Sequence, residues 1–531
     1  MKKIKIIIIL LLISSHAFSQ IPAAVWYKAY GGSDQERPTS AEKTSDGGYI
    51  FAGFTKSSDG DITQSNYGVN DFWVVKTDQN GNKIWQKSYG GTGNESNLKI
   101  KQTSDGGYFL VGASSSNNND VTGNHQPSGG TSYKRDIWVA KLDAYGTIIW
   151  SKCIGGSNDD GGDGYNFKGL DFKLTNDGGL IIAANSGSWD GDAALRPIGQ
   201  GNPIWIFKLN NLGTIQWSNF YGGNGGPTII DAINKTSDGG YIVACETRFT
   251  NLPNFHGLGN ADFWIFKIDS MGTMQWNKCF GGTIDDIPYD IIQTSDGNYV
   301  AVGTSRSTDG DVTGNHGSYD GWMIKISNTG NLLWQKSLGG SRDEELKSVL
   351  ETSDGGFMIL GTTDSYNNGD VSGNHSDCAG CTDLWLLKTN ATGTKLWQVC
   401  YGQGAEDYAT QLIDNNNNTY TLFGFTAFGC PLWPTNYLGD AYLAIKLGYP
   451  TNIIDNNKIN QNIIYPNPAN KTVNIISESM KYFKLFDING KLINSSTNNL
   501  IDVSNMSKGI YFINLYDSDN SLIHQEKFIK E

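Results

Sequence analysis

Tryptophan spacing is the feature of this sequence that most limits its possible folds. Seven Trp residues recur at separations of 58 to 67 residues, each within a segment such as IWQKSYGGT: Trp26, Trp85, Trp150, Trp217, Trp276, Trp334 and Trp397. A second Trp lies 12 residues before each of the last six. A motif close to TSDGGYI follows most of these segments, with a decayed last copy at 416–420. A period of this length indicates seven structural repeats and not a few independent domains.

Each repeat reads as four short strands. In the first repeat we expect them at 39–44, 49–55, 71–77 and 83–89, separated by DGG, by a long polar loop and by DQNG. Asp-Gly and Asn-Gly between β-rich segments form hairpin turns, because these residues tolerate a positive φ. Four antiparallel strands repeated radially make a β-propeller blade. The fold class predicted for the body is therefore all-β, a seven-bladed β-propeller.

The two ends of the repeat array predict how the ring closes. The seventh repeat has a third strand at 440–448 but no Trp strand after it, whereas AVWYKAYGG near the start is a fourth strand without a blade. If the N-terminal strand completes the last blade, no sheet edge stays open. A six-bladed ring with an extra repeat and an open solenoid are the alternatives. The predicted organisation is a signal peptide at 1–19, the propeller at 20–448, a linker at 449–461 and a C-terminal domain at 462–531.

The first residues have the pattern of a signal peptide. Three lysines precede an apolar stretch at 6–13, and small residues lead to a cleavage site between Ser19 and Gln20. The apolar stretch is too short to span a bilayer, and no later segment is long enough, so no transmembrane segment is expected. Removing the three lysines changes the formal charge from −13 to −16. Such acidity disfavours nucleic acid and anionic membranes as partners.

Residues 462–531 differ in character from the repeats and contain short apolar strands separated by turns. The motifs that stand out are Tyr465, Pro466, Asn467 and Pro468, then Asp487, Gly490 and Lys491 in DINGK, then Gly509, Tyr511 and Lys527. In this order they resemble the type A C-terminal sorting domain of the type IX secretion system of Bacteroidota, a small β-sandwich. The body is similar to repeat propellers of other secreted bacterial proteins, which implies an architecture but no activity.

The sorting-domain resemblance implies export in two steps. The signal peptide leads to the periplasm, and the outer-membrane translocon and its sorting machinery then read the C-terminal domain. In that family the domain is typically removed, and the cargo is released or attached to the cell surface. We therefore expect a secreted or surface-attached protein.

Two kinds of long loop are expected on one face of the ring, and both are rich in acidic residues. Asp59 with Asp61 and Asp309 with Asp311 form Asp-Gly-Asp pairs in the loops between second and third strands. Carboxylates and carbonyls in this arrangement could bind Ca²⁺, the only cofactor that the sequence suggests. Alternatively, the carboxylates cap their own turns. This acidic long-loop face is the predicted ligand-binding surface, for a glycan or a protein.

A few residues depart from the repeat pattern. Trp189, followed by Asp190 and Asp192, and Trp433 are the two Trp outside the regular positions. They predict a sugar platform with carboxylates beside an exposed ring, or else loop residues packed on their own blade. Cys378 and Cys381 could pair with each other, or one of them with Cys430, because export permits disulfides.

No catalytic residue can be assigned from the sequence. GxSxG, HExxH and comparable motifs are absent, and the carboxylates recur with the repeat, whereas an active site needs its groups once. We therefore expect a binding module and not an enzyme. A structural scaffold without a discrete ligand and a secreted propeller hydrolase or lyase are the alternatives.

Overall fold

A computed structural model describes most of the chain. The described residues are 21–64, 66–125, 134–162, 168–197, 202–222, 228–248, 260–374, 381–402, 406–416, 419–427, 440–448, 463–465, 471–476, 480–487, 491–518 and 522–530. The predicted signal peptide and cleavage residues Ser19 and Gln20 lie outside them. The chain divides into two compact units, Met1–Pro450 and Thr451–Glu531.

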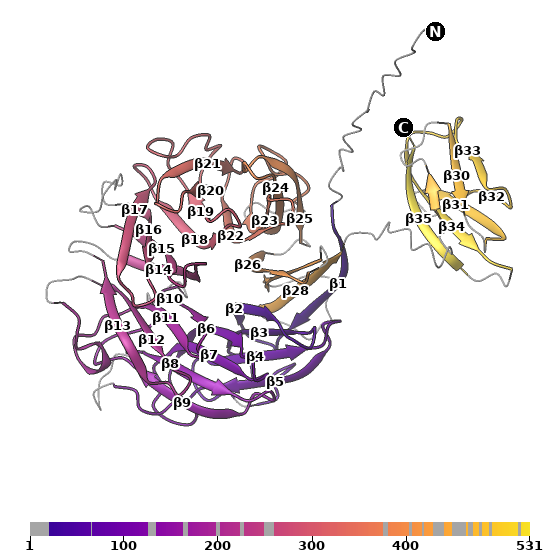
Figure 1. Cartoon of the computed structure of the whole chain (residues 1–531). Coiled ribbons are helices and arrows are strands. Elements are labelled where there is room, and N and C mark those ends of the chain that lie inside the picture. Colours follow the sequence, from indigo (N-terminus) through magenta and orange to yellow (C-terminus); the bar gives the residue numbers. More distant parts are fainter. Residues whose placement is uncertain are drawn as a thin grey trace, which may run out of the picture. The chain divides into compact units, whose positions relative to one another are not determined.

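The described residues of the first unit form seven four-stranded antiparallel sheets arranged as a ring (Figure 1). Blade 1 contains β2 (Glu36–Lys43), β3 (Tyr49–Thr55), β4 (Asp71–Thr77) and β5 (Lys83–Tyr89). Blade 2 contains β6 (Glu95–Gln102), β7 (Tyr108–Ser114), β8 (Asp136–Leu142) and β9 (Ile148–Ile154). Blade 3 contains β10 (Leu170–Leu174), β11 (Leu180–Asn185), β12 (Ile204–Leu209) and β13 (Ile215–Tyr221). Blade 4 contains β14 (Thr228–Lys235), β15 (Tyr241–Thr247), β16 (Asp262–Ile268) and β17 (Met274–Phe280).

The remaining three blades complete the ring. Blade 5 contains β18 (Asp286–Gln293), β19 (Tyr299–Ser305), β20 (Asp320–Ile326) and β21 (Leu332–Leu338). Blade 6 contains β22 (Glu344–Glu351), β23 (Phe357–Thr363), β24 (Asp383–Thr389) and β25 (Lys395–Tyr401). Blade 7 contains β26 (Asp407–Asp414), β27 (Tyr420–Thr426), β28 (Ala441–Gly448) and β1 (Ala23–Tyr30). The predicted all-β propeller is confirmed, and the seven sheets of the described residues agree with the seven predicted blades.

The N-terminal strand closes the ring as predicted. β1 pairs with β28 antiparallel, from Ala23 opposite Gly448 to Tyr30 opposite Tyr442. The innermost strands, which are the first strand of each blade, also contact one another in order, and the last of them, β26, contacts β2. The strand β2 begins three residues earlier than expected, because Glu36 is buried and its N–H donates to Asp440 O of blade 7 at 3.1 Å.

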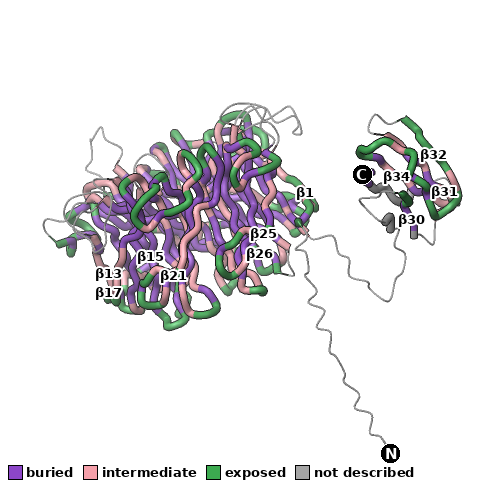
Figure 2. Tube along the Cα trace, turned by 90° about the horizontal axis from the view of Figure 1, so that it is seen from above, coloured by how far each residue is buried: buried purple, intermediate pink, exposed green. Residues whose placement is uncertain are grey.

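Apolar packing between blades forms the core of the ring. The second and third strands of most blades are buried along their whole length, since both faces of each sheet lie against a neighbouring blade (Figure 2). Seven apolar clusters each join two adjacent blades. The third-strand Trp side chains are at most 1% exposed. Trp73 Nε1, for example, donates to Gln86 Oε1 at 2.8 Å, which ties the third strand to the fourth.

The fourth-strand Trp explains why the turn between the third and fourth strands ends in glycine. Gly146 has φ +76, and a Cβ at this position would lie 3.0 Å from the Trp85 ring of the preceding blade. The same approach joins Trp26 of β1 to Gly81 of blade 1. The regular spacing of the fourth-strand Trp residues therefore reflects a contact that recurs between blades, an indole ring packed on a glycine turn of the next blade.

In blades 1 to 6 the lysine of the third strand is held by the aspartate of the turn between the first and second strands. Lys76 Nζ lies 2.8 Å from Asp46, and Lys141 Nζ lies 2.9 Å from Asp105. The corresponding pairs in blades 3 to 6 are Lys208 with Asp177, Lys267 with Asp238, Lys325 with Asp296, and Lys388 with Asp354. These repeated lysines are therefore structural.

The second unit is a small sandwich of two sheets. The first contains β29 (Ile463–Tyr465), β30 (Thr472–Ile476) and β33 (Leu500–Asp502). The second contains β31 (Tyr482–Asp487), β32 (Leu492–Ser496), β34 (Gly509–Tyr516) and β35 (Leu522–Lys530). Side chains from both sheets, among them Val473, Leu485 and Ile513, form one buried cluster.

Candidate ligand-binding cavity on the ring axis

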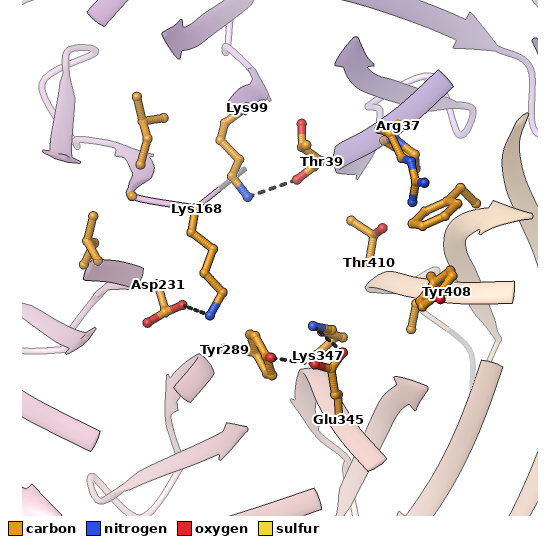
Figure 3. Close-up of a pocket in the computed structure, with 16 residues that line it drawn as sticks. Arg37, Thr39, Lys99, Lys168, Asp231, Tyr289, Glu345, Lys347, Tyr408 and Thr410 are labelled. Atoms are coloured by element: carbon orange, nitrogen blue, oxygen red, sulfur yellow. Dashed lines mark hydrogen bonds and ion pairs between the residues drawn. The ribbon is translucent and has the colours of Figure 1, made fainter. Parts of the chain in front are cut away.

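A cavity of about 270 Å³ lies on the axis of the ring, where the innermost strands face one another (Figure 3). This volume is near the lower end of the range in which proteins hold small molecules. All seven blades contribute to its wall. Its polar lining residues include Arg37, Thr39, Lys99, Lys168, Asp231, Tyr289, Glu345, Lys347 and Thr410.

Five of these side chains reach the axis because the innermost strands are bulged. In each case the register against the second strand shifts by one residue, and the extra residues are Thr39, Asp231, Tyr289, Lys347 and Thr410. A bulge leaves one residue unpaired in the ladder and changes the direction of its side chain. All five extra residues line the cavity. The backbone thus directs polar side chains of four types to the axis from five blades.

Tyr289 is the centre of the polar contacts in the cavity (Figure 3). Its hydroxyl donates to Glu345 Oε1 at 2.8 Å. The Lys347 and Lys168 ammonium groups lie 3.5 and 4.4 Å from the centroid of its ring, within the range of cation-π attraction. Burial and the nearby Glu345 carboxylate raise the pKa of the Tyr289 hydroxyl well above its usual value. Tyr289 therefore stays a neutral hydrogen-bond donor that positions two cations.

Two carboxylates hold these lysines in place. Asp231 Oδ1 lies 3.1 Å from Lys168 Nζ, and Glu345 Oε2 lies 2.8 Å from Lys347 Nζ. Asp231 Oδ2 also accepts the backbone N–H of Glu246 at 3.1 Å. Burial raises the pKa of Asp231 to about 6, although Lys168 opposes this effect. Burial also lowers the pKa of Lys347, although Glu345 opposes it.

Lys99 differs from the other lysines of the cavity. Its ammonium donates to the backbone oxygen of Thr39 at 3.0 Å, and no carboxylate among the described residues lies within ion-pair distance of it. On the same strand, Lys101 is paired with Glu42 at 3.6 Å. Burial lowers the pKa of the Lys99 ammonium. The cavity therefore contains one cation whose charge is not matched by a direct partner.

A second recess, of about 140 Å³, extends the cavity along the axis. It shares Thr39, Lys99, Tyr289 and Lys347 with the first and adds Lys173 and Asp290 among others. Lys173 is paired with Asp171 at 2.8 Å. Asp290 accepts the backbone N–H of Val349 at 3.0 Å and so links two blades. Lys99 and Tyr289 thus lie between two connected spaces.

The paired aspartates predicted as calcium ligands contact backbone amides of the loop that leads into the same blade. The pairs are Asp59 with Ser33, Asp61 with Gly31, Asp309 with Thr283 and Asp311 with Gly281, at 2.7, 3.2, 2.8 and 3.3 Å. Within the described ranges, no three His, Cys, Asp or Glu side chains are grouped so as to hold a metal ion. These contacts are those of the turn-capping interpretation, and calcium binding gains no support from them.

Trp189 is exposed but partly covered. Its ring is 44% exposed and lies just before a single 3-10 turn, η1 (Gly191–Ala193). The Arg196 guanidinium lies over the ring, 3.8 Å from its centroid. One ring face is therefore occupied by this chain, and a sugar could stack only on the other.

The carboxylates beside Trp189 have the same role as their counterparts in other blades. Asp190 Oδ1 accepts the N–H of Ser157 at 2.7 Å, and Asp192 Oδ2 accepts that of Gly155 at 3.2 Å. Trp433, the other predicted platform residue, lies outside the described residues. The structure thus does not bring the four predicted ligand-binding residues together into one described site.

The predicted disulfide residues are only partly described. Cys381 is disulfide-bonded, while Cys378 and Cys430 lie outside the described residues. Cys245, Cys279 and Cys400 are buried free thiols, and burial raises the pKa of each, which fits packing residues.

The sorting motifs have structural roles within the sandwich. Asp487 Oδ1 accepts the N–H of Lys491 at 2.9 Å and closes a hairpin. Tyr511 stacks on Phe528 with ring centroids 5.5 Å apart, and Gly509 pairs with Lys530. Tyr465 and Lys527 are described only for their backbone, and Pro466, Asn467, Pro468 and Gly490 lie outside the described residues.

The predicted acidic face is partly wrong, because the last acid of most blade-to-blade motifs is buried. Glu95, for example, is 0% exposed and accepts hydrogen bonds from the hydroxyls of Ser114 and Ser116 at 2.6 and 2.7 Å. It lies beside Asp71, which is also 0% exposed, at the start of the preceding blade's third strand. Burial raises the pKa of Glu95 to about 7 and that of Asp71 to about 6.

This carboxyl pair recurs between blades and explains the first glycine of the GG motif. A Cβ at Gly90 would lie 2.7 Å from Asp71 Oδ1 and 2.9 Å from Glu95 Oε2. The other pairs are Asp136 with Asp160 at Gly155, Asp262 with Asp286 at Gly281, Asp320 with Glu344 at Gly339, and Asp383 with Asp407 at Gly402. These carboxyls belong to the blade interfaces and are not available to a ligand on the loops.

Sequence reasoning missed the axial cavity, although a signal was present. The first strand of each repeat carries residues that differ in charge from blade to blade, including Thr39, Lys99, Asp231, Tyr289 and Lys347. Such variation within an otherwise regular repeat marks positions where the fold of the repeat does not require one particular residue type.

The fold and the cavity define a β-propeller with a small polar pocket on its axis. Residues 463–531 match the family described as "Secretion system C-terminal sorting domain". The C-terminal unit is therefore a type IX sorting domain, and the chain is exported through that system to the cell surface or the extracellular space. This match also implies interaction with the type IX machinery. The described residues include no helix long and apolar enough to cross a membrane.

Other comparisons give low similarity. "Regulatory protein FlaEY" of Caulobacter vibrioides is 28% identical over 159 residues, which are 29% of this chain and 17% of that protein. A polysaccharide lyase described as "PL25-Ulvanlyase" aligns with 76% of this chain and 93% of its own, at 8% identity and a TM-score of 0.45. A protein of unknown function from Dyadobacter fermentans aligns with 67% and 95%, at 12% identity and a TM-score of 0.38. Likeness at this level carries no argument about activity.

Proposed function

We propose that this chain is an extracellular binding protein that takes a small polar ligand into the axial cavity of its propeller. The observation that carries the proposal is the convergence of non-repeating polar side chains from different blades on one cavity. A repeat that served only as a scaffold would have no need of bulges that direct polar side chains of four types to the axis in five blades. The proposal replaces the long-loop face by the axis as the binding site.

A cavity-filling variant tests this proposal. Thr410 is a bulge residue of the cavity wall, and Thr410→Trp should fill the cavity without changing any charge. Thr392→Trp, in an exposed turn of blade 6, is the matched control. The wild-type chain is first screened on arrays of glycans and small metabolites, and both variants are then measured against every probe that it retains.

The expected result is loss of binding in Thr410→Trp and retention in Thr392→Trp. Binding that survives in Thr410→Trp but is lost in Trp189→Ala would place the site on the long-loop face and refute the proposal. A wild-type chain that retains no probe would favour a scaffold. Breakdown of an arrayed polysaccharide would instead favour a hydrolase or lyase.

The sorting domain gives the export part of the function its own test. Deleting 463–531 should leave the chain in the periplasm, measured by fractionation and immunoblotting. Surface display of the truncated chain would contradict its role as the sorting signal.

A further inference from the structure

We infer that the axial cavity binds a small ligand through an oxyanion group, a carboxylate, sulfate or phosphate, with Lys99 as its principal contact. The inference rests on the proposed function and adds the chemical class of the ligand.

The cavity is locally cationic in an acidic protein. Four cationic side chains line it, Arg37, Lys99, Lys168 and Lys347, against the two carboxylates Asp231 and Glu345. The chain as a whole carries a formal charge of −13. An excess of cations inside a half-enclosed space focuses the potential there and attracts anions.

The two carboxylates of the cavity are already engaged. Asp231 contacts Lys168 with one oxygen and the backbone N–H of Glu246 with the other. Glu345 contacts Lys347 and accepts the hydrogen bond of the Tyr289 hydroxyl. Neither is within ion-pair distance of Lys99. The pairs therefore fix the lysines around Tyr289 and leave Lys99 without a carboxylate at ion-pair distance.

Arg37 and the lysines of the adjoining recess are matched in the same way. Arg37 pairs with Asp440 at 2.8 Å and lies over the Phe425 ring, 4.0 Å from its centroid. Lys101 and Lys173 have the carboxylate partners described above. Among the described cations of the cavity and the recess, Lys99 is the one without a carboxylate at ion-pair distance.

An oxyanion would supply the direct counter-ion and the hydrogen-bond acceptors that Lys99 lacks. An ammonium group has three donors, and the backbone oxygen of Thr39 occupies one of them. Asp171 and Asp290 act on the Lys99 charge from beyond ion-pair distance. A half-buried cation without a direct counter-ion is unfavourable, so an anion in contact with Lys99 reduces that cost. The ammonium groups of Lys168 and Lys347 line the same cavity and can add to the attraction.

The size of the cavity and the charge of the ring restrict the ligand further. About 270 Å³ admits a small molecule or one residue of a longer chain. A nucleic acid would also bring phosphates, but its length would meet an acidic ring, which repels polyanions. A small ligand with one or two acidic groups fits both observations.

Isothermal titration calorimetry of the full chain tests the inference with sodium glucuronate, inorganic sulfate and inorganic phosphate, and with glucose as the neutral probe. At least one anion should bind, and its affinity should fall as salt is added. Lys99→Met should weaken that anion by about tenfold or more, the loss expected for one charge-assisted contact. Lys99→Arg should retain most of the affinity.

Lys87→Met, on the outermost strand of blade 1, removes the same charge away from the axis and is the matched control. It should leave the affinity unchanged, and Trp fluorescence should show that all variants are folded. Unchanged affinity in Lys99→Met, or the absence of binding by all three anions, would overturn the inference. If glucose binds, and its binding is lost in Thr410→Trp but unchanged in Lys99→Met, the inference of an oxyanion ligand would also be overturned. The proposal of an axial binding site would still stand in that case.

Discussion

The carboxyl pairs between blades should make the ring less stable as the pH rises toward 8. Glu95 is buried beside Asp71, and burial raises its pKa from 4.5 to about 7. Because the native state then binds the proton more tightly than the unfolded chain, its stabilising effect is complete below about pH 4.5 and is lost as the pH rises through about 7. A rise of this size corresponds to roughly 3 kcal/mol.

Glu95→Gln isolates this contribution. Gln has the same shape and can keep the hydrogen bonds from Ser114 and Ser116, but it cannot ionise. Between about pH 5 and pH 8, the free energy of unfolding should therefore fall less in the variant, by up to roughly 3 kcal/mol. Glu42→Gln removes a carboxyl from the outer end of β2 and is the control for the loss of one negative charge.

Urea unfolding followed by Trp fluorescence measures the effect. All 15 Trp residues lie at or before Trp433, so the signal reports on the propeller and not on the sorting domain. The midpoints of wild type, Glu95→Gln and Glu42→Gln are compared at each pH. If Glu95→Gln shows the same pH dependence as wild type, the native state does not hold this proton and the reasoning fails.

Three further predictions concern the turns and the closure of the ring. Gly146→Ala should lower the free energy of unfolding in urea by about 2 to 4 kcal/mol, because it adds a close contact with Trp85 to the strain of a positive φ. Gly106→Ala, with open space around it, should lower it by about 1 to 2 kcal/mol. Equal losses in the two variants would contradict the packing role. Asp105→Asn should cost about 0.5 to 1 kcal/mol at pH 7. This difference should disappear as the pH falls toward 2, because Thr103 and the third-strand lysine lower the pKa of Asp105 to about 2; a cost that persists there would refute the ion-pair explanation. Deleting Ala23–Tyr30 should expose the edge of blade 7 and cause self-association, measured by size-exclusion chromatography. A synthetic peptide of these residues should reverse the self-association. A monomeric, fully folded deletion variant would show that closure by this strand is dispensable.

The blades could be predicted because their landmarks are local. Turn glycines and paired Trp residues set the strand bounds, and Tyr49–Thr55, Asp71–Thr77 and Lys83–Tyr89 are found where the sequence places them. The N-terminal strand before Gly31 could be recognised as the fourth strand of a blade for the same reason. Each signal comes from neighbouring residues and from a spacing that recurs six or seven times.

The cavity and the buried carboxyls could not be predicted because they depend on distant partners. The bulge that turns Tyr289 toward the axis is visible only in the register of β18 against β19. Likewise, GGTGNE reads as a solvated acidic loop, whereas Glu95 is buried by Ser114, Ser116 and the preceding blade. A sequence read in one dimension shows the charges but not which of them face each other.

Closure by β1 has a consequence for how the chain can fold during its synthesis and export. The first strand of the ring must find its partner more than 400 residues later, since Ala23 lies opposite Gly448. Such a contact forms slowly, because the intervening chain must be ordered before the ends can meet. A chain cut short at any blade leaves two open sheet edges that invite aggregation or proteolysis. The first strand of the ring is therefore paired, and so protected, only when the last blade has been made.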